Sequence, residues 1–127
     1  MALYPTTVAG KRVLVVDDDP DIRELLSSAL GDEGFEVAPA ANGEEALAVI
    51  STFRPDVIVL DLMMPVMDGW QFASELRARD QEIPLVLLSA ARDLRLHAER
   101  LEAAEVIEKP FDLGELLPKI SRAASAA

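Results

Sequence analysis

The sequence contains no cysteine and no long apolar run, and each absence excludes a class of protein. Without cysteine, neither a disulfide framework nor a thiolate metal site can form, and nothing indicates an oxidising compartment. The longest apolar runs are four or five residues, far short of the ~20 residues of a membrane-spanning helix. The first twelve residues also lack the order of a secretory signal. We therefore expect a cytoplasmic protein with no membrane insertion.

Basic residues are also scarce. The 12 Lys and Arg are outnumbered by 23 Asp and Glu, which gives a net charge of −11. A chain this acidic is repelled by nucleic acid phosphates, so we expect no direct nucleic acid binding. The 127 residues, 50% of them hydrophobic, suffice for one substantial core. We expect a single domain over residues 1–127, with its core over about 11–122 and flexible ends.

Four short apolar runs, rich in β-branched and aliphatic residues, predict strands buried on both faces. They span residues 13–16, 57–60, 85–88 and 106–107. A weaker edge strand is predicted at 35–37, because Pro39 follows it. Segments of helical period lie between these strands. The alternation predicts an α/β fold, (βα)₅, in which right-handed crossovers build a doubly wound, five-stranded parallel sheet.

The predicted helices begin at recognisable capping residues. Asp19 precedes a proline, and three further caps have the spacing of a capping box: Asn42 with Glu45, Asp68 with Gln71, and Asp112 with Glu115. Pro118 lies inside the last helical pattern, where it should bend or shorten the helix. The small residues 123–127 are expected to fray.

Polar side chains of reactive type follow the apolar runs directly. They are Asp17 and Asp18 after the first run, Asp61 after the run at 57–60, Ser89 after the run at 85–88, and Lys109 after the last. The carboxyl ends of parallel strands meet at one edge of a sheet, where ligands bind in such folds. We therefore expect these five side chains to converge on one spot.

Three converging carboxylates repel one another unless a cation neutralises them, which implies a divalent ion. An all-oxygen site that offers carboxylates suits Mg²⁺. Lys109 and Ser89 would add a positive charge and a hydroxyl donor, which suit an anion with several acceptor oxygens. A phosphoryl group fits, and its transfer to a carboxylate nucleophile needs mainly positioning and charge neutralisation.

These motifs resemble the receiver domains of two-component response regulators over residues 11–122. The resemblance implies a flavodoxin-like receiver topology. Within VLVVDDDP, Asp18 would be a direct Mg²⁺ ligand and Asp17 would act largely through water. Within VLDLMMPVMDG, Asp61 would be the phosphoacceptor, and Met63 would offer its backbone carbonyl to the metal.

The resemblance also assigns the remaining site residues. Ser89 in LLSA would bond a phosphoryl oxygen, and Lys109 in EKPF would pair with it, with a cis Lys109–Pro110 bond. Two departures concern the route by which the signal leaves the site. Val106 stands where the family has an aromatic switch residue, and the stretch 89–109 is about two residues shorter than usual, which would trim the fourth helix.

The expected partners are a sensor histidine kinase or phosphotransfer protein, which donates the phosphoryl group, and an unknown downstream protein. We expect a stand-alone, non-enzymatic switch that catalyses only its own phosphorylation and dephosphorylation; a receiver excised from a larger protein is the alternative. Two other functions remain open. One is a phosphorylation-independent interaction module, and the other is a phosphohydrolase with an aspartyl-phosphate intermediate, disfavoured because Met63 replaces its second acid. The single histidine, His97, is expected to be solvated.

Overall fold

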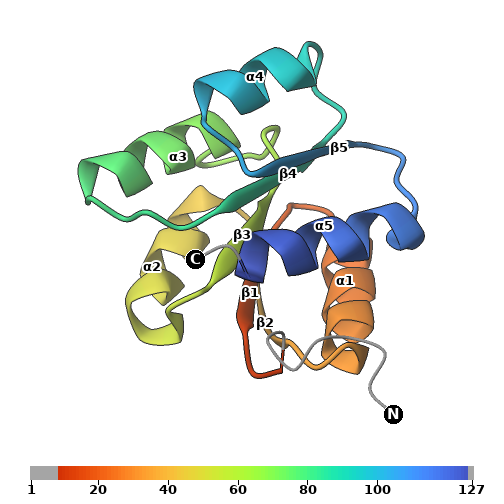
Figure 1. Cartoon of the computed structure of the whole chain (residues 1–127). Helices are drawn as coiled ribbons and strands as arrows, with labels where there is room; N and C mark the ends of the chain where they lie inside the picture. Colours follow the sequence, from red (N-terminus) through yellow and green to blue (C-terminus); the bar gives the residue numbers. More distant parts are fainter. Residues whose placement is uncertain (1–8, 126–127) are drawn as a thin grey trace.

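The structure is a computed structural model that describes residues 9–125 (Figure 1). The strands are β1 (Arg12–Val16), β2 (Glu36–Ala40), β3 (Val57–Leu60), β4 (Leu85–Ser89) and β5 (Glu105–Glu108). The helices are α1 (Pro20–Asp32), α2 (Gly43–Phe53), α3 (Gly69–Ala78), α4 (Leu94–Arg100) and α5 (Leu113–Ser125). Across this described range, every helix is too short or too polar to cross a bilayer.

The five strands form one parallel sheet in the order β2-β1-β3-β4-β5. This order confirms the predicted doubly wound (βα)₅ fold, with the chain first building outward to β2 and then returning past β1. Helices α1 and α5 cover one face, and α2, α3 and α4 cover the other (Figure 1). The weak strand is indeed at an edge, and it includes Pro39.

Two apolar clusters hold the helices to the sheet. Because successive strand residues point to opposite faces, Leu14 and Val16 pack with α2 and α3, whereas Val13 and Val15 pack with α1 and α5. Strands β3 and β4 are buried along their whole length. The central strands therefore hold their carboxyl ends in fixed positions.

The predicted helix caps are present, but two of the three predicted capping boxes are not reciprocal. The Glu45 carboxylate accepts from the Ala41 N–H at 3.0 Å and not from the Asn42 N–H. Asp19 and Asn42 cap α1 and α2, and Asp68 forms a reciprocal capping box with Gln71 at the start of α3. Asp112 instead accepts a hydrogen bond from the Gly114 N–H at 2.8 Å. The Glu115 side chain lies 3.5 Å from Lys119, so it serves an ion pair one turn along the helix.

The end of the chain differs from the prediction. Helix α5 continues through Pro118 as one segment to Ser125. Ala123 and Ala124 are helical and buried in the apolar cluster that α5 shares with the sheet. Small side chains allow close helix packing there, so the core extends beyond residue 122 and these two residues do not fray. The expectations for residues 1–8 and 126–127 lie outside the described residues.

Gly69 lets α3 begin directly against the end of β3. A Cβ at this position would lie 2.5 Å from the Asp61 carbonyl oxygen and 2.7 Å from the Leu62 Cα. Both neighbours are backbone atoms, which cannot rotate away. The Gly69 N–H also donates to the Leu62 carbonyl at 3.0 Å, so the turn between Asp61 and α3 is held closed.

We predict that Gly69→Ala destabilises the fold by about 1–3 kcal/mol, because the added methyl group must displace this turn. Urea unfolding measures the change. The control is Gly31→Ala in α1, where a Cβ meets nothing within 4 Å and alanine should stabilise the helix by about 0.5–1 kcal/mol. Equal effects of the two substitutions would contradict the predicted close contact.

Candidate functional site

The predicted site residues meet at the carboxyl edge of the sheet, and the sheet's own hydrogen bonds hold their backbones. The Asp17 N–H donates to the Ala40 carbonyl at 3.1 Å, and the Asp61 N–H donates to the Val16 carbonyl at 3.0 Å. The Lys109 N–H donates to the Ser89 carbonyl at 2.9 Å. Asp17, Asp61 and Lys109 thus each extend a strand by one position, and Ser89 is the last residue of β4. Their backbones are therefore held as firmly as those of strand residues.

Asp61 is the centre of the site. Its Oδ1 accepts hydrogen bonds from the Ser89 hydroxyl at 2.7 Å and from the Met63 N–H at 3.1 Å. Its Oδ2 accepts one from the Lys109 ammonium at 2.9 Å. The residue is 5% exposed, which leaves a narrow approach for a reactant. Hydrogen-bond donors on both oxygens offset the cost of burying the carboxylate. The carboxylate can still act as a nucleophile.

Lys109 bridges two carboxylates. Its Nζ lies 2.8 Å from Asp17 Oδ2 as well as 2.9 Å from Asp61 Oδ2. Burial alone would lower the pKa of Lys109, but the hydrogen bonds to Asp17 and Asp61, with their negative charges, raise it above its ordinary value. The ammonium group therefore stays charged at neutral pH.

Asp17 is nearly fully buried, and its environment only partly compensates for that burial. Burial raises the pKa of the Asp17 carboxyl above its ordinary value, although Lys109 and the Asp19 N–H, which donates to Oδ1 at 2.9 Å, act in the opposite direction. The guanidinium of Arg23 donates to the Asp17 carbonyl at 2.7 Å. This residue is thus fixed from three sides.

The acidic residues are close enough to hold one cation. Asp17, Asp18 and Asp61 each offer a carboxylate oxygen, and these oxygens lie within 4.8 Å of one another. Asp17 and Asp61 are buried, whereas Asp18 is exposed to solvent. A donor set of hard oxygens with one side open to water fits Mg²⁺, which keeps several waters when it binds. The cluster confirms that the predicted acids converge.

The other residues singled out in the sequence also take defined positions. The Lys109–Pro110 bond is cis, as expected. The Met63 side chain is exposed, and its N–H faces Asp61. Val106, at the predicted switch position, is half-buried in β5 and packs against the core. Helix α4 has only seven residues, in keeping with the short stretch that precedes Lys109.

The expectation for His97 was wrong. Its Nδ1 accepts a hydrogen bond from Trp70 Nε1 at 3.1 Å, and the side chain is half-buried rather than solvated. The two residues are 27 positions apart, so no local spacing in the sequence signals this pair. Tertiary packing of α3 beside α4 brings them together.

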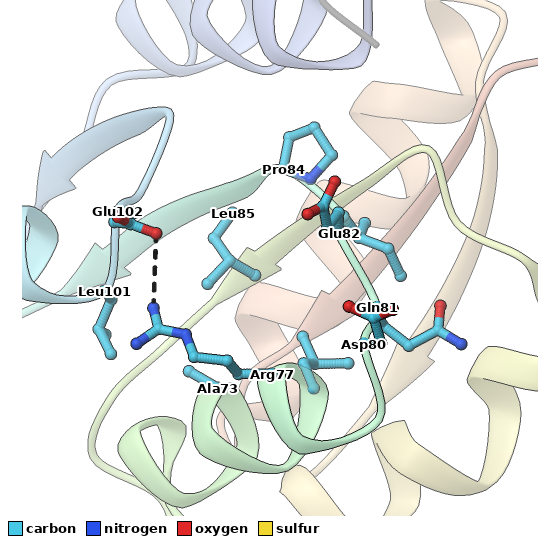
Figure 2. Close-up of a pocket in the computed structure, with 11 residues that line it drawn as sticks. Ala73, Arg77, Asp80, Gln81, Glu82, Pro84, Leu85, Leu101 and Glu102 are labelled. Atoms are coloured by element: carbon cyan, nitrogen blue, oxygen red, sulfur yellow. Dashed lines mark ion pairs between the residues drawn. The ribbon is translucent and has the colours of Figure 1, made fainter.

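A separate hollow of about 500 Å³ lies at the opposite end of the sheet (Figure 2). Leu85, at the start of β4, lies with Ala73 and Leu101 on its walls, and Arg77 pairs with Glu102 at 3.7 Å. The hollow contains no group of nucleophiles or cation ligands comparable to the acidic cluster. The candidate site for chemistry is therefore the carboxyl edge.

Comparison with protein families gives a match to the response regulator receiver domain over residues 13–121. Among curated proteins, the transcriptional regulatory protein PrrA of Mycobacterium tuberculosis is 44% identical over 117 residues, which are 91% of this chain and 50% of that protein. The regulatory protein AtoC of Escherichia coli is 38% identical over 91% of this chain and 25% of its own length. The chain thus spans half or less of these relatives.

Solved structures give a consistent match. The chemotaxis response regulator CheY4 of Vibrio cholerae is 36% identical with a TM-score of 0.82, covering 91% of this chain and 99% of that one. The response regulator TrrA of Thermotoga maritima, solved in complex with Mg²⁺ and BeF, is 39% identical with a TM-score of 0.79. That match covers 89% of this chain and 98% of TrrA.

We predict that Lys109→Met destabilises the fold by roughly 2 kcal/mol at pH 7 in EDTA, because Asp17 and Asp61 then face each other without a counter-charge. A carboxyl whose pKa is raised in the folded state destabilises it only when ionised. The loss of stability should therefore be small below pH 3.8, the ordinary pKa of Asp17. It should grow as the pH rises through the raised pKa of Asp17 in the folded state.

Urea unfolding at several pH values in EDTA measures this loss. The control is Lys11→Met, which removes the same charge at the other end of β1. A loss at pH 7 no larger than that of the control, or one independent of pH, would contradict the assigned role of Lys109.

Proposed function

The chain belongs to the response regulator receiver domain family, and from this we propose that it is a signalling switch phosphorylated on Asp61. The donor is a phosphohistidine of a sensor histidine kinase or phosphotransfer protein. The observation that carries the proposal is the Asp61 carboxylate, which is buried between the Ser89 hydroxyl and the Lys109 ammonium. The setting is cytoplasmic, where such kinases present their phosphohistidine.

Asp61 is the nucleophile. One carboxylate oxygen forms a bond to phosphorus while the bond from phosphorus to the donor imidazole nitrogen breaks, and that nitrogen keeps the electron pair and takes up a proton. Lys109 and Ser89 already lie within 2.9 Å of the attacking carboxylate. They need only small movements to donate to oxygens of the incoming phosphoryl group. There they stabilise the negative charge of the phosphoryl oxygens, as they now stabilise that of the Asp61 carboxylate.

The acidic cluster is the Mg²⁺ site. Asp18 and Asp61 would hold the ion directly, Asp17 would act largely through water, and Met63 would offer its backbone carbonyl. A bound Mg²⁺ supplies positive charge that draws phosphoryl oxygens toward the carboxylates. The exposed position of Asp18 beside two buried acids supports this arrangement, because the open side leaves room for waters and phosphate oxygens.

The result of phosphorylation is a changed affinity for a downstream protein. The chain catalyses only its own phosphorylation and dephosphorylation, and it does so as a single domain. Its relatives PrrA and AtoC are longer regulatory proteins, of which the matched segment is 50% and 25%. With a charge of −11, these residues do not themselves bind nucleic acid, so the signal passes through a protein contact.

We predict that acetyl phosphate with Mg²⁺ adds one phosphoryl group, detected by intact mass. The addition should be lost in EDTA and in Asp61→Asn, because both the metal charge and the nucleophile are required. Asp80→Asn is the matched control, since Asp80 is exposed at the opposite end of the sheet. Absence of the modification in the unaltered chain, with Mg²⁺ present, would favour the phosphorylation-independent module.

We also predict that Mg²⁺ stabilises the fold. At a concentration of 100 times its dissociation constant, a ligand specific for the folded state adds about 2.7 kcal/mol to the free energy of unfolding. Asp18→Asn should remove most of this gain without disturbing the core, because Asp18 is exposed. Thermal unfolding with and without Mg²⁺ measures it, and an unchanged gain in Asp18→Asn would contradict the ligand assignment.

A further inference from the structure

Helix α4 is weakly anchored. It has seven residues, and its N-cap, Asp93, makes no side-chain capping bond and has a φ of 55°. Only Leu94 and Ala98 on this helix are buried. A helix this short is not stable by itself, so its position depends on a few contacts with the rest of the fold.

Hollows flank α4 on two sides. The hollow of about 500 Å³ in Figure 2 is bounded by Leu101 and Glu102, directly after the end of α4. A second hollow, of about 550 Å³, lies between α4, β5 and α5, with Leu94 and Val106 among its lining residues. These hollows leave part of the surface around α4 without packed side chains.

One directional contact joins α4 to α3. The Trp70 indole N–H donates to His97 Nδ1 at 3.1 Å, and the two rings meet edge to face with their centroids 5.0 Å apart. Because an indole nitrogen can only donate, His97 Nδ1 must accept. This bond requires a neutral imidazole with its proton on Nε2. A protonated His97 would have hydrogens on both nitrogens and could not accept this bond.

This contact, the Trp70–His97 link, joins the two helices that follow Asp61 and Ser89. On one side, Trp70 adjoins Gly69, where an added Cβ would lie 2.5 Å from the Asp61 carbonyl oxygen. On the other side, the segment before α4 includes Ala91, whose N–H faces Ser89 Oγ at 3.3 Å. Ser89 Oγ donates in turn to Asp61 Oδ1 at 2.7 Å. The link therefore closes a loop of contacts around the reactive carboxylate.

We propose that Trp70 and His97 are positioning residues for the phosphorylation site, and that their link holds α4 and the segment before it in place only while His97 is neutral. Protonation of His97 breaks the link, loosens α4 and misaligns Ser89 relative to Asp61. The effect on Ser89 and Asp61 rests on the proposed phosphorylation of Asp61. The effect of the link on α4 concerns the unphosphorylated fold alone.

Several charged groups near α4 are paired with one another. On α3, Arg77 pairs with Glu102 at 3.7 Å and Arg79 with Glu75 at 3.7 Å, and on β5 Glu105 pairs with Arg122 at 3.2 Å. Helix α4 and its N-cap carry two acidic residues, Asp93 and Glu99, and two arginines, Arg95 and Arg100, so their charges balance. His97 is also the single histidine of the chain, and histidine is the side chain that ordinarily titrates between pH 5 and 8.

The first test is hydrogen exchange of the α4 amides at pH 8 and pH 5.5, expressed as protection factors corrected for intrinsic exchange. In the unaltered chain, protection of α4 should fall about two- to tenfold at the lower pH, the range expected for loss of one hydrogen bond. Amides of β3 should show no such change, because the sheet does not depend on the link.

Three variants separate the link from general packing. His97→Asn keeps an acceptor oxygen near the Nδ1 position but cannot be protonated, so protection should stay high at both pH values. His97→Phe and Trp70→Phe keep an aromatic ring but lose the acceptor or the donor, so protection should be low at both. Two outcomes would overturn the proposal. One is an unaltered chain whose α4 protection does not change with pH, and the other is a variant whose protection changes with pH as much as that of the unaltered chain.

The second test compares rates of phosphorylation by acetyl phosphate with Mg²⁺. The ratio of the unaltered chain's rate to that of His97→Asn should fall about two- to tenfold from pH 8 to pH 5.5, and this ratio cancels effects of pH on the donor and on Asp17. A constant ratio, with the exchange result as expected, would overturn the effect on Ser89. Absence of phosphorylation in both chains would instead overturn the proposed function, while the exchange data still decide the link.

Discussion

The Lys109 ammonium between two buried carboxylates is the interaction on which the site depends. The sheet brings Asp17 and Asp61 together as extensions of β1 and β3, and two ionised acids in that position oppose folding unless a positive charge lies between them. Lys109 supplies that charge from β5 at 2.8 and 2.9 Å. The same charge prepares the site for an anion, so stability and reactivity share one residue.

The fold and the composition of the site could be predicted from the sequence because both follow from strand ends. Runs such as Val57–Leu60 are too short for helices, and their burial on both faces leaves a parallel sheet as the solution. Once the strands are parallel, Asp61 and Ser89 must share an edge. Capping residues such as Asp68 fixed the helix starts, since their side chains bond to neighbours only a few positions away.

Two of the features that escaped prediction depend on contacts between distant segments, and a third on a neighbour one helical turn away. Ala123 and Ala124 look like a frayed end, but α5 buries them in the apolar cluster on the sheet, which local composition does not reveal. His97 looks like a surface residue, and only the placement of α4 beside Trp70 gives it a partner. The spacing of Asp112 and Glu115 suggested a capping box, but Lys119, one turn further on, competes for the same carboxylate.

The open sheet also has two edges, and both are protected. Strand β2 carries Pro39, which has no N–H to offer to an added strand, and β5 has four residues, of which Glu105 and Glu108 carry negative charges. Proline and charge at an edge discourage strand addition. Molecules of this chain should therefore resist edge-to-edge aggregation when crowded, which leaves helices and loops as the surfaces through which they make reversible contacts.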